Sequence, residues 1–216
     1  MRYKIKLTKR YVFLLLLFLS VNFEVFSQTG PGGIGDSTEN RLWLRASDLS
    51  GYNDGDQLQT WIDTSGNKNH AIQNILGSQP LYDSIAINNL PAVSFDGVDD
   101  FYKNIFGIDS TNHTVFAVFA HDHDRASPPE GNIWIENPEI ESSGFYPMNA
   151  AGDHVLYYDD SYSQLSKTSS FAQNTWYISS VLRDVNSTEL WKDGSLVQST
   201  SINGISVDSF AISYQP

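Results

Sequence analysis

The 216-residue chain contains no cysteine. It therefore forms no disulfide bonds, and an exported form must be stabilised by its core alone or by its core and a bound metal. The absence also excludes a lipid-modified N-terminal cysteine of the kind that anchors bacterial lipoproteins. A long apolar run is missing too, because Val12–Leu19 is well short of the roughly 18 residues that span a bilayer.

The N-terminus has the layout of an export signal. Five basic residues precede the apolar run Val12–Leu19, and Val25-Phe26-Ser27 before Gln28 is a plausible small-residue cleavage site. We therefore predict a signal peptide over residues 1–27 and a secreted or cell-surface protein without membrane insertion. Residues 28–40, rich in Gly and polar residues, are expected to form a flexible lead-in.

Positive charge is scarce. The chain has 13 Lys and Arg against 25 Asp and Glu, and removing the predicted leader takes away five basic residues and Glu24, so the net charge falls from −12 to −16. Such a field disfavours nucleic acid and anionic lipid as partners and attracts cations. Solubility outside the cell is the preferred explanation of this acidity.

Sustained helical periodicity is absent as well. Short apolar runs recur about every ten residues between Gly, Asn and Asp clusters, which favours an all-β sandwich or barrel of a single domain. The expected strands are residues 41–45, 60–62, 91–95, 113–120, 132–136, 154–158 and 207–213, together with a late hairpin.

The late hairpin spans Thr175–Thr200. Apolar and polar residues alternate along the first strand, which places Trp176, Ile178, Ser180 and Leu182 on one face. Asp193-Gly194 supplies the positive-φ positions that a two-residue turn requires. These residues are interpreted as structural, so a binding site is expected in the acidic turns instead.

Four segments in order carry a family resemblance: LWLRASDL (42–49), WIDTSGNKNHA (61–71), LPAVSFDGVDDFY (90–102) and the hairpin. Together they resemble laminin-G-like domains of the concanavalin A-like lectin/glucanase superfamily, in a form common in exported bacterial proteins. The resemblance implies a two-sheet antiparallel jelly-roll sandwich over residues 41–216. Relatives have one more long strand after the position of Val207–Ser213, so we expect this domain to lack its last strand and to be a fragment of marginal stability.

Two acidic turns are candidate calcium sites. Asp96, Asp99 and Asp100 lie within five residues of one another, and Asp63 and Asn67 offer further oxygen ligands. Calcium takes six to eight oxygen atoms, and loops between strands supply them readily. Relatives frequently bind calcium, though not always at these positions. The same residues also make ordinary tight turns, and that alternative stays open.

Two other patterns are weaker. His121 and His123 alternate as in some zinc sites, yet no sequence spacing identifies a third ligand, and an exposed loop is the preferred interpretation. Glu136, Glu139 and Glu141 invite comparison with glycosidases, but Pro138 interrupts the alternation that would place two carboxylates on one strand face. We therefore predict no catalytic residues.

Aromatic residues are plentiful and suit stacking on sugar rings. The candidate ligand-binding residues are Tyr157, Tyr158, Asp159 and Trp134, and Trp191 belongs to the same aromatic group. Aromatic side chains are also ordinary on pleated sheets. The sequence thus favours a non-catalytic module that binds a glycan or a cell-surface protein, with calcium as a candidate cofactor. The alternatives are a polysaccharide-degrading enzyme or its accessory module, and a structural spacer domain.

Overall fold

The computed structural model describes the chain in segments. These are residues 30, 35–103, 105, 112–121, 133–136, 143–146, 155–158, 163–164, 171–172, 174–201 and 209–213. The predicted signal peptide lies outside them. Within the described segments, no helix has the length and apolar character needed to cross a membrane.

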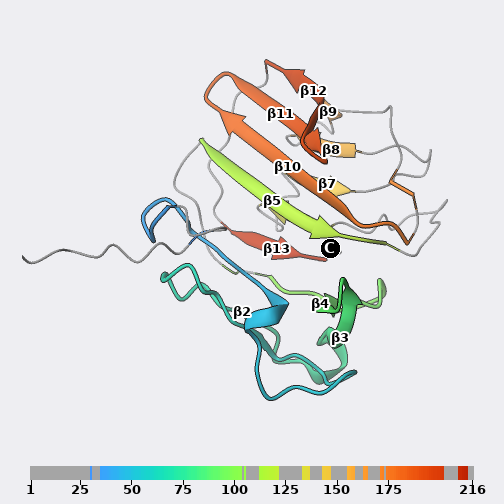
Figure 1. The fold of residues 1–216 in the computed structure, drawn as a ribbon. Coiled ribbons are helices and arrows are strands. Elements are labelled where there is room, and N and C mark those ends of the chain that lie inside the picture. The colour runs from blue at the N-terminus through green and yellow to red at the C-terminus, as the bar shows by residue number, and fades with distance from the viewer. Residues whose placement is uncertain are drawn as a thin grey trace, which may run out of the picture.

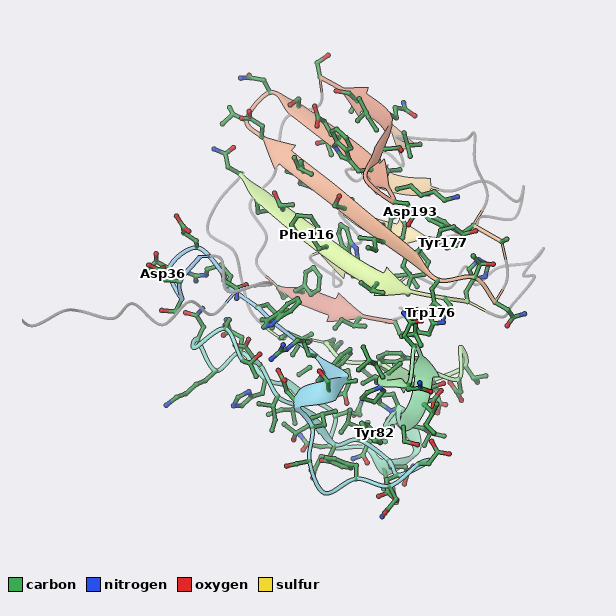
Figure 2. All side chains as sticks on the ribbon, viewed as in Figure 1. Asp36, Tyr82, Phe116, Trp176, Tyr177 and Asp193 are labelled. Carbon is green, nitrogen blue, oxygen red and sulfur yellow. The ribbon has the colours of Figure 1, made fainter. Side chains whose placement is uncertain are left out.

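One sheet has four antiparallel strands. β5 (His113–Phe119), β10 (Tyr177–Asp184), β11 (Ser187–Lys192) and β12 (Ser195–Thr200) lie in the order β12-β11-β10-β5 (Figure 1). Successive side chains point to opposite faces of a strand. Phe116 of β5 therefore stands on one face, where 65% of it is exposed (Figure 2), while Phe119 is buried on the other.

The second sheet has five strands in the order β13-β6-β7-β8-β9. They are β13 (Phe210–Ile212), β6 (Trp134–Glu136), β7 (Ser143–Tyr146), β8 (Val155–Tyr158) and β9 (Ser163–Gln164), and all neighbours are antiparallel.

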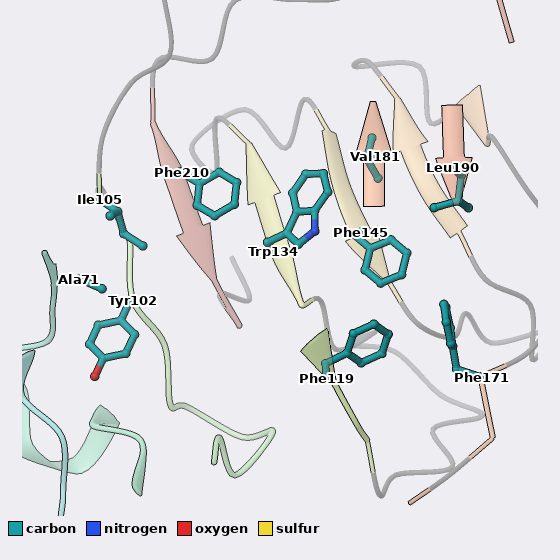
Figure 3. Close-up of a cluster of buried hydrophobic side chains, with 10 residues drawn as sticks. All are labelled: Ala71, Tyr102, Ile105, Phe119, Trp134, Phe145, Phe171, Val181, Leu190 and Phe210. Atoms are coloured by element: carbon teal, nitrogen blue, oxygen red, sulfur yellow. The ribbon is translucent and has the colours of Figure 1, made fainter. Parts of the chain in front are cut away.

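Aromatic rings fill the space between the sheets (Figure 3). Phe119 of the four-stranded sheet meets Phe145 of the five-stranded sheet edge to face, with ring centroids 5.5 Å apart. Trp134 stacks between Phe145 and Phe210 at 6.3 and 5.7 Å. Each such pair adds about 0.5–1.5 kcal/mol beyond simple burial. The protein is thus a two-sheet antiparallel sandwich, and the predicted all-β fold class is confirmed.

The N-terminal part contributes two small hairpins and two 3-10 turns. β1 (Thr60–Trp61) pairs with β2 (Ala71–Ile72), and β3 (Leu81–Ile87) pairs with β4 (Leu90–Ser94). The 3-10 turns are η2 (Ala46–Asp48) and η3 (Leu76–Ser78).

Tyr102 joins this part to the sandwich. Its backbone exchanges two hydrogen bonds with Ile212 of β13, at 3.0 and 2.8 Å. Its fully buried hydroxyl donates to the Leu58 carbonyl at 2.6 Å. One residue thus connects β13 to the segment before β1.

Most predicted strands are found within one to three residues of the expected ends. The predicted strand over residues 41–45 is wrong, because only Leu44 forms a bridge, to Asp63. Trp43 instead donates its N–H to the Asp63 carboxylate and accepts at its carbonyl from Thr64. The Asp63 carboxylate thus accepts the Trp43 N–H, which in a regular sheet would donate to the carbonyl of a neighbouring strand.

Candidate functional site

The acidic turn after β4 gathers three carboxylates. Asp96, Asp99 and Asp100 each offer an oxygen, and these atoms all lie within 4.8 Å of one another. Oδ1 of Asp96 accepts the N–H groups of Val98, Asp99 and Asp100 at 2.8, 3.1 and 3.3 Å. Oδ2 of Asp100 in turn accepts the N–H of Asp96 at 3.0 Å. The turn is therefore held by its own backbone.

The electrostatics of this turn favour a neutralising group. Burial raises the pKa of Asp100, and the negative charges of Asp96 and Asp99 raise it further against the hydrogen bond from the Asp96 N–H. Carboxylate oxygens are the ligands that calcium prefers, and three of them at this spacing fit half of a six-oxygen shell. Either a cation or a proton would relieve the repulsion.

The predicted ligands Asp63 and Asn67 are engaged elsewhere. Asp63 accepts four hydrogen bonds, from the N–H groups of Trp43, Ser65 and Asn69 and from the Ser65 hydroxyl, at 2.8–2.9 Å. Burial acts to raise the pKa of Asp63, but these bonds outweigh it and lower the pKa below its usual value.

Asn67 donates its side-chain amide to the carbonyls of Ser37 and Asn40, both at 2.9 Å. Among the described residues, the acidic group that could hold a metal contains neither Asp63 nor Asn67. The structure therefore does not join the two acidic turns into one site. The contacts of Asp63 and Asn67 organise the N-terminal loops.

The predicted ligand-binding residues do not form a described site. Trp134 is 2% exposed, with its ring between Phe145 and Phe210, so it presents no face to a ligand. Tyr157 and Tyr158 lie in β8, whose side chains are outside the description, and Asp159 lies outside the described residues. For these three residues sugar binding stays a prediction.

The histidine pair at 121 and 123 and the three glutamates at 136, 139 and 141 have little support in the described part of the chain. Nε2 of His121 lies 2.8 Å from the Phe171 carbonyl, and residues 122–124 are outside the description. Glu139 and Glu141 lie outside it too, as does the side chain of Glu136.

The four-stranded sheet exposes apolar side chains on the face turned away from the five-stranded sheet, here called the outer face. Phe116, Val118 and Ile178 are 65%, 60% and 52% exposed, and Leu196 is 49% exposed. On the same sheet Val181 and Leu190 are buried on the other face. A contiguous apolar area on a solvent-facing sheet is a common mark of an interaction site.

An aromatic row crosses the outer face. Phe116 and Trp191 pair with Ser180 from opposite sides, and Leu196 pairs with Trp191 at the end of the row. Two strand spacings separate the backbones of Phe116 and Trp191 by about 9.5 Å. The small Ser180 lies between the two rings, so this row forms a shallow trough.

Trp191 is oriented by its own strand. Its indole Nε1 donates to Oε2 of Glu189 at 3.0 Å. The pairing register of β12 on β11 shifts opposite Leu190 and Trp191, where Val197 of β12 is the extra residue, as at a β-bulge. The Trp191 ring is half-buried and is held in place by the bond to Glu189.

A hollow of about 480 Å³ lies at one end of the outer face. Its lining residues are Asn112, His113, Thr114, Leu182, Arg183, Asp184, Ser187 and Glu189. Glu189 lines this hollow and bonds Trp191, so the hollow adjoins the aromatic row. The hollow and the row together are the best candidate site in the described structure.

Sequence reasoning did not select this site. The sequence groups Trp191 with several other aromatic residues, and the predicted alternation that places Ile178, Ser180 and Leu182 on one face is confirmed. However, an alternating strand does not reveal which face the second sheet covers. The cross-strand neighbour Phe116 could be identified only from the register of β5 on β10.

The comparisons support the fold. No known protein family and no curated protein matches the chain. The chain is similar to domain 4 of AbnA, a GH43 extracellular arabinanase from Geobacillus stearothermophilus solved in complex with arabinotriose, with TM-score 0.55 and 12% identity over 76% of this chain and 87% of that domain. At this identity the likeness shows a shared fold alone, in agreement with the antiparallel β-sandwich described above.

Two more distant structures were found. One is an alginate lyase from Corynebacterium sp., with TM-score 0.36 and 14% identity over 62% of this chain and 54% of that one. The other is a kappa-carrageenase from Pseudoalteromonas carrageenovora in complex with an oligotetrasaccharide of kappa-carrageenan. It has TM-score 0.26 and 9% identity over 82% of this chain and 76% of that one. Scores this low carry no argument. The laminin-G-like assignment stays a prediction.

Proposed function

We propose that this chain is a non-catalytic carbohydrate-binding module of an exported protein, and that it binds a neutral glycan on the outer face of the four-stranded sheet. The observation that carries the proposal is the aromatic row, in which Phe116 and Trp191 flank Ser180 on a solvent-facing sheet. Flat rings offer the apolar faces of sugar residues a surface on which to stack, at low entropic cost since each ring has only two side-chain torsions.

The net negative charge of the chain favours neutral glycans over anionic ones as ligands. The chain carries a net charge of −12, and −16 without the predicted leader. Anionic polysaccharides would be repelled at long range, whereas neutral ones would not. The fold shared with a domain of an extracellular arabinanase, solved with arabinotriose, makes arabinan and other neutral glycans the starting panel.

The acidic turn adds calcium to the proposal. Asp96, Asp99 and Asp100 would hold the ion, with remaining ligands from backbone carbonyls and water. Calcium there would stabilise the loop after β4. We assign it no part in contacting the glycan.

The test is binding of the full chain to a panel of soluble polysaccharides, measured by affinity electrophoresis and calorimetry. Phe116→Ala is the key variant, because Phe116 is 65% exposed and its loss leaves the core intact. Removal of a ring anchor costs about 2 kcal/mol or more, which is roughly a thirtyfold loss of affinity. Ile85→Ala is the matched control, because Ile85 is 71% exposed on β3, outside this sheet.

Each alternative predicts a different result. A spacer domain would bind no member of the panel, with or without calcium. An enzyme would release reducing sugar from a bound polysaccharide during prolonged incubation. Equal binding by the Phe116→Ala variant and the wild type would move the site away from the outer face.

A further inference from the structure

The hollow belongs to the outer face rather than to the interior of the sandwich. Five of its eight lining residues occupy even positions of β10 and β5 or odd positions of β11, which are the positions directed outward. The pairs Leu182–Thr114, Leu182–Glu189 and Asp184–Ser187 build it as two further rows beside the aromatic row.

The hollow and the aromatic row are continuous. Rows on one face of a sheet are two residues apart, which is about 6.7 Å along the strands. Glu189 lies one such step from Trp191 and bonds its indole at 3.0 Å. A ligand lying over Trp191 and Ser180 that extends along β10 towards Asp184 enters the hollow directly.

The sheet ends at this hollow. Asp184 and Ser187 are the last pair of the β10–β11 hairpin, and Val185, the first of the two connecting residues, is 48% exposed. A ligand chain that follows the strands has no further sheet to lie on beyond this pair. The hollow therefore suits the end of a chain rather than its interior.

The chemistry of the lining suits one sugar residue. Thr114 and Ser187 present hydroxyls, Asn112 an amide, and Asp184 and Glu189 carboxylates, around the 36% exposed Leu182. These groups supply both donors and acceptors for sugar hydroxyls, and Leu182 supplies an apolar contact for a ring face. The volume of about 480 Å³ lies within the range of small-ligand sites.

We infer that the hollow binds the terminal residue of a neutral glycan while the aromatic row carries the residues behind it, so that the module recognises chain ends. This inference rests on the proposed glycan-binding function and specifies how the outer face is used. The hollow's two carboxylates and single buried Arg183 make it an unfavourable place for an anionic terminal sugar.

The test uses linear arabinan and linear β-1,4-xylan, intact and after limited endo-hydrolysis, as competitors against one immobilised polysaccharide that the chain retains. Chain-end recognition predicts that inhibition per gram rises in proportion to the number of ends, which are counted by reducing-sugar assay. Inhibition per gram that stays flat while ends increase tenfold overturns the inference and leaves the proposed function intact. Failure to bind any polysaccharide overturns both.

Two variants test the hollow itself. Thr114→Trp places a bulky strand-compatible side chain in it, and the dependence on chain ends is expected to disappear. Ser187→Ala removes one hydroxyl and is expected to weaken binding of short oligosaccharides about fivefold, the value of one hydrogen bond. Ser199→Ala, also exposed on the outer face but on β12 and outside the hollow's lining, is the control. Unchanged end dependence in a folded Thr114→Trp protein contradicts the inference.

Discussion

Glu189 and Trp191 lie two residues apart on the same face of β11, and the carboxylate accepts a hydrogen bond from the indole Nε1 at 3.0 Å. The bond fixes the plane of the half-buried indole ring. It also connects the polar hollow to the aromatic row. The pair therefore determines whether the outer face is a pre-organised surface or a collection of mobile side chains.

Glu189→Ala should weaken glycan binding by about five- to tenfold, since an ordered ring loses less entropy on binding than a mobile one. Glu189→Gln keeps an acceptor oxygen and should retain most of the affinity. Calorimetry measures the loss, and tryptophan fluorescence reports the change around the ring. If Glu189→Ala bound as tightly as the wild type, the orientation of Trp191 would be irrelevant to binding.

Tyr102→Phe should destabilise the fold by about 1–2 kcal/mol, because it leaves the buried Leu58 carbonyl without its donor. Burial raises the pKa of Tyr102, and the neighbouring Tyr52 and Asp100 add to this. A raised pKa means that the stabilisation is fully present below the ordinary tyrosine value of about 10 and is lost as the pH rises above it.

The wild type should therefore lose its advantage over Tyr102→Phe above pH 10, by up to about 1.4 kcal/mol per pH unit. Urea unfolding of both proteins at several pH values between 8 and 11 gives the difference directly. A stability difference that stays constant over this range would show that the Tyr102 hydroxyl ionises freely in the folded state.

The turn and the alternation of the late hairpin followed from local chemistry. Asp193 and Gly194 have φ values of 48° and 76°, as a two-residue hairpin turn requires. Local chemistry did not predict which face of β10 is buried. Ser179 is 1% exposed and Arg183 3%, whereas their apolar neighbour Ile178 is 52% exposed. Which face is buried depends on where the second sheet packs, and no local pattern encodes that.

The candidate sites likewise contain some features that local sequence patterns predict and others that only the fold brings together. Asp63 and Asp100 are chemically alike in the sequence, yet one carboxylate accepts four hydrogen bonds and the other lies between two more carboxylates. Thr114 and Glu189 of the hollow are 75 positions apart in the sequence and meet only through their common neighbour Leu182. Local motifs therefore identified the acidic turn but not the outer face.

Asp63→Asn should cost about 2–3 kcal/mol, because the charged acceptor strengthens several of its hydrogen bonds and an amide cannot replace both oxygens. The pKa of Asp63 is lowered in the folded state, so its stabilisation is present above the ordinary aspartate value of about 3.9 and is lost as the pH falls below it. Urea unfolding at pH 7 and pH 3 should show a large difference between variant and wild type only at pH 7. Asp54→Asn, at an exposed carboxylate bonded to Ser84, should show a much smaller loss.

Asp100→Asn separates a calcium site from an ordinary turn. The pKa of Asp100 is raised, so its ionised form opposes folding, and the opposition grows as the pH rises above the ordinary aspartate value. In EDTA at pH 7 the variant should therefore be at least as stable as the wild type, with the Asn oxygen still able to accept from the Asp96 N–H. Saturating calcium should reverse this order: at a hundred times the dissociation constant the wild type gains about 2.7 kcal/mol, and the variant gains far less.

Asp83→Asn is the control, because Asp83 lies outside the cluster on β3 and should respond to calcium like the wild type. Equal stability of the wild type in EDTA and in calcium would mean that the three carboxylates form a turn stabilised by its backbone alone.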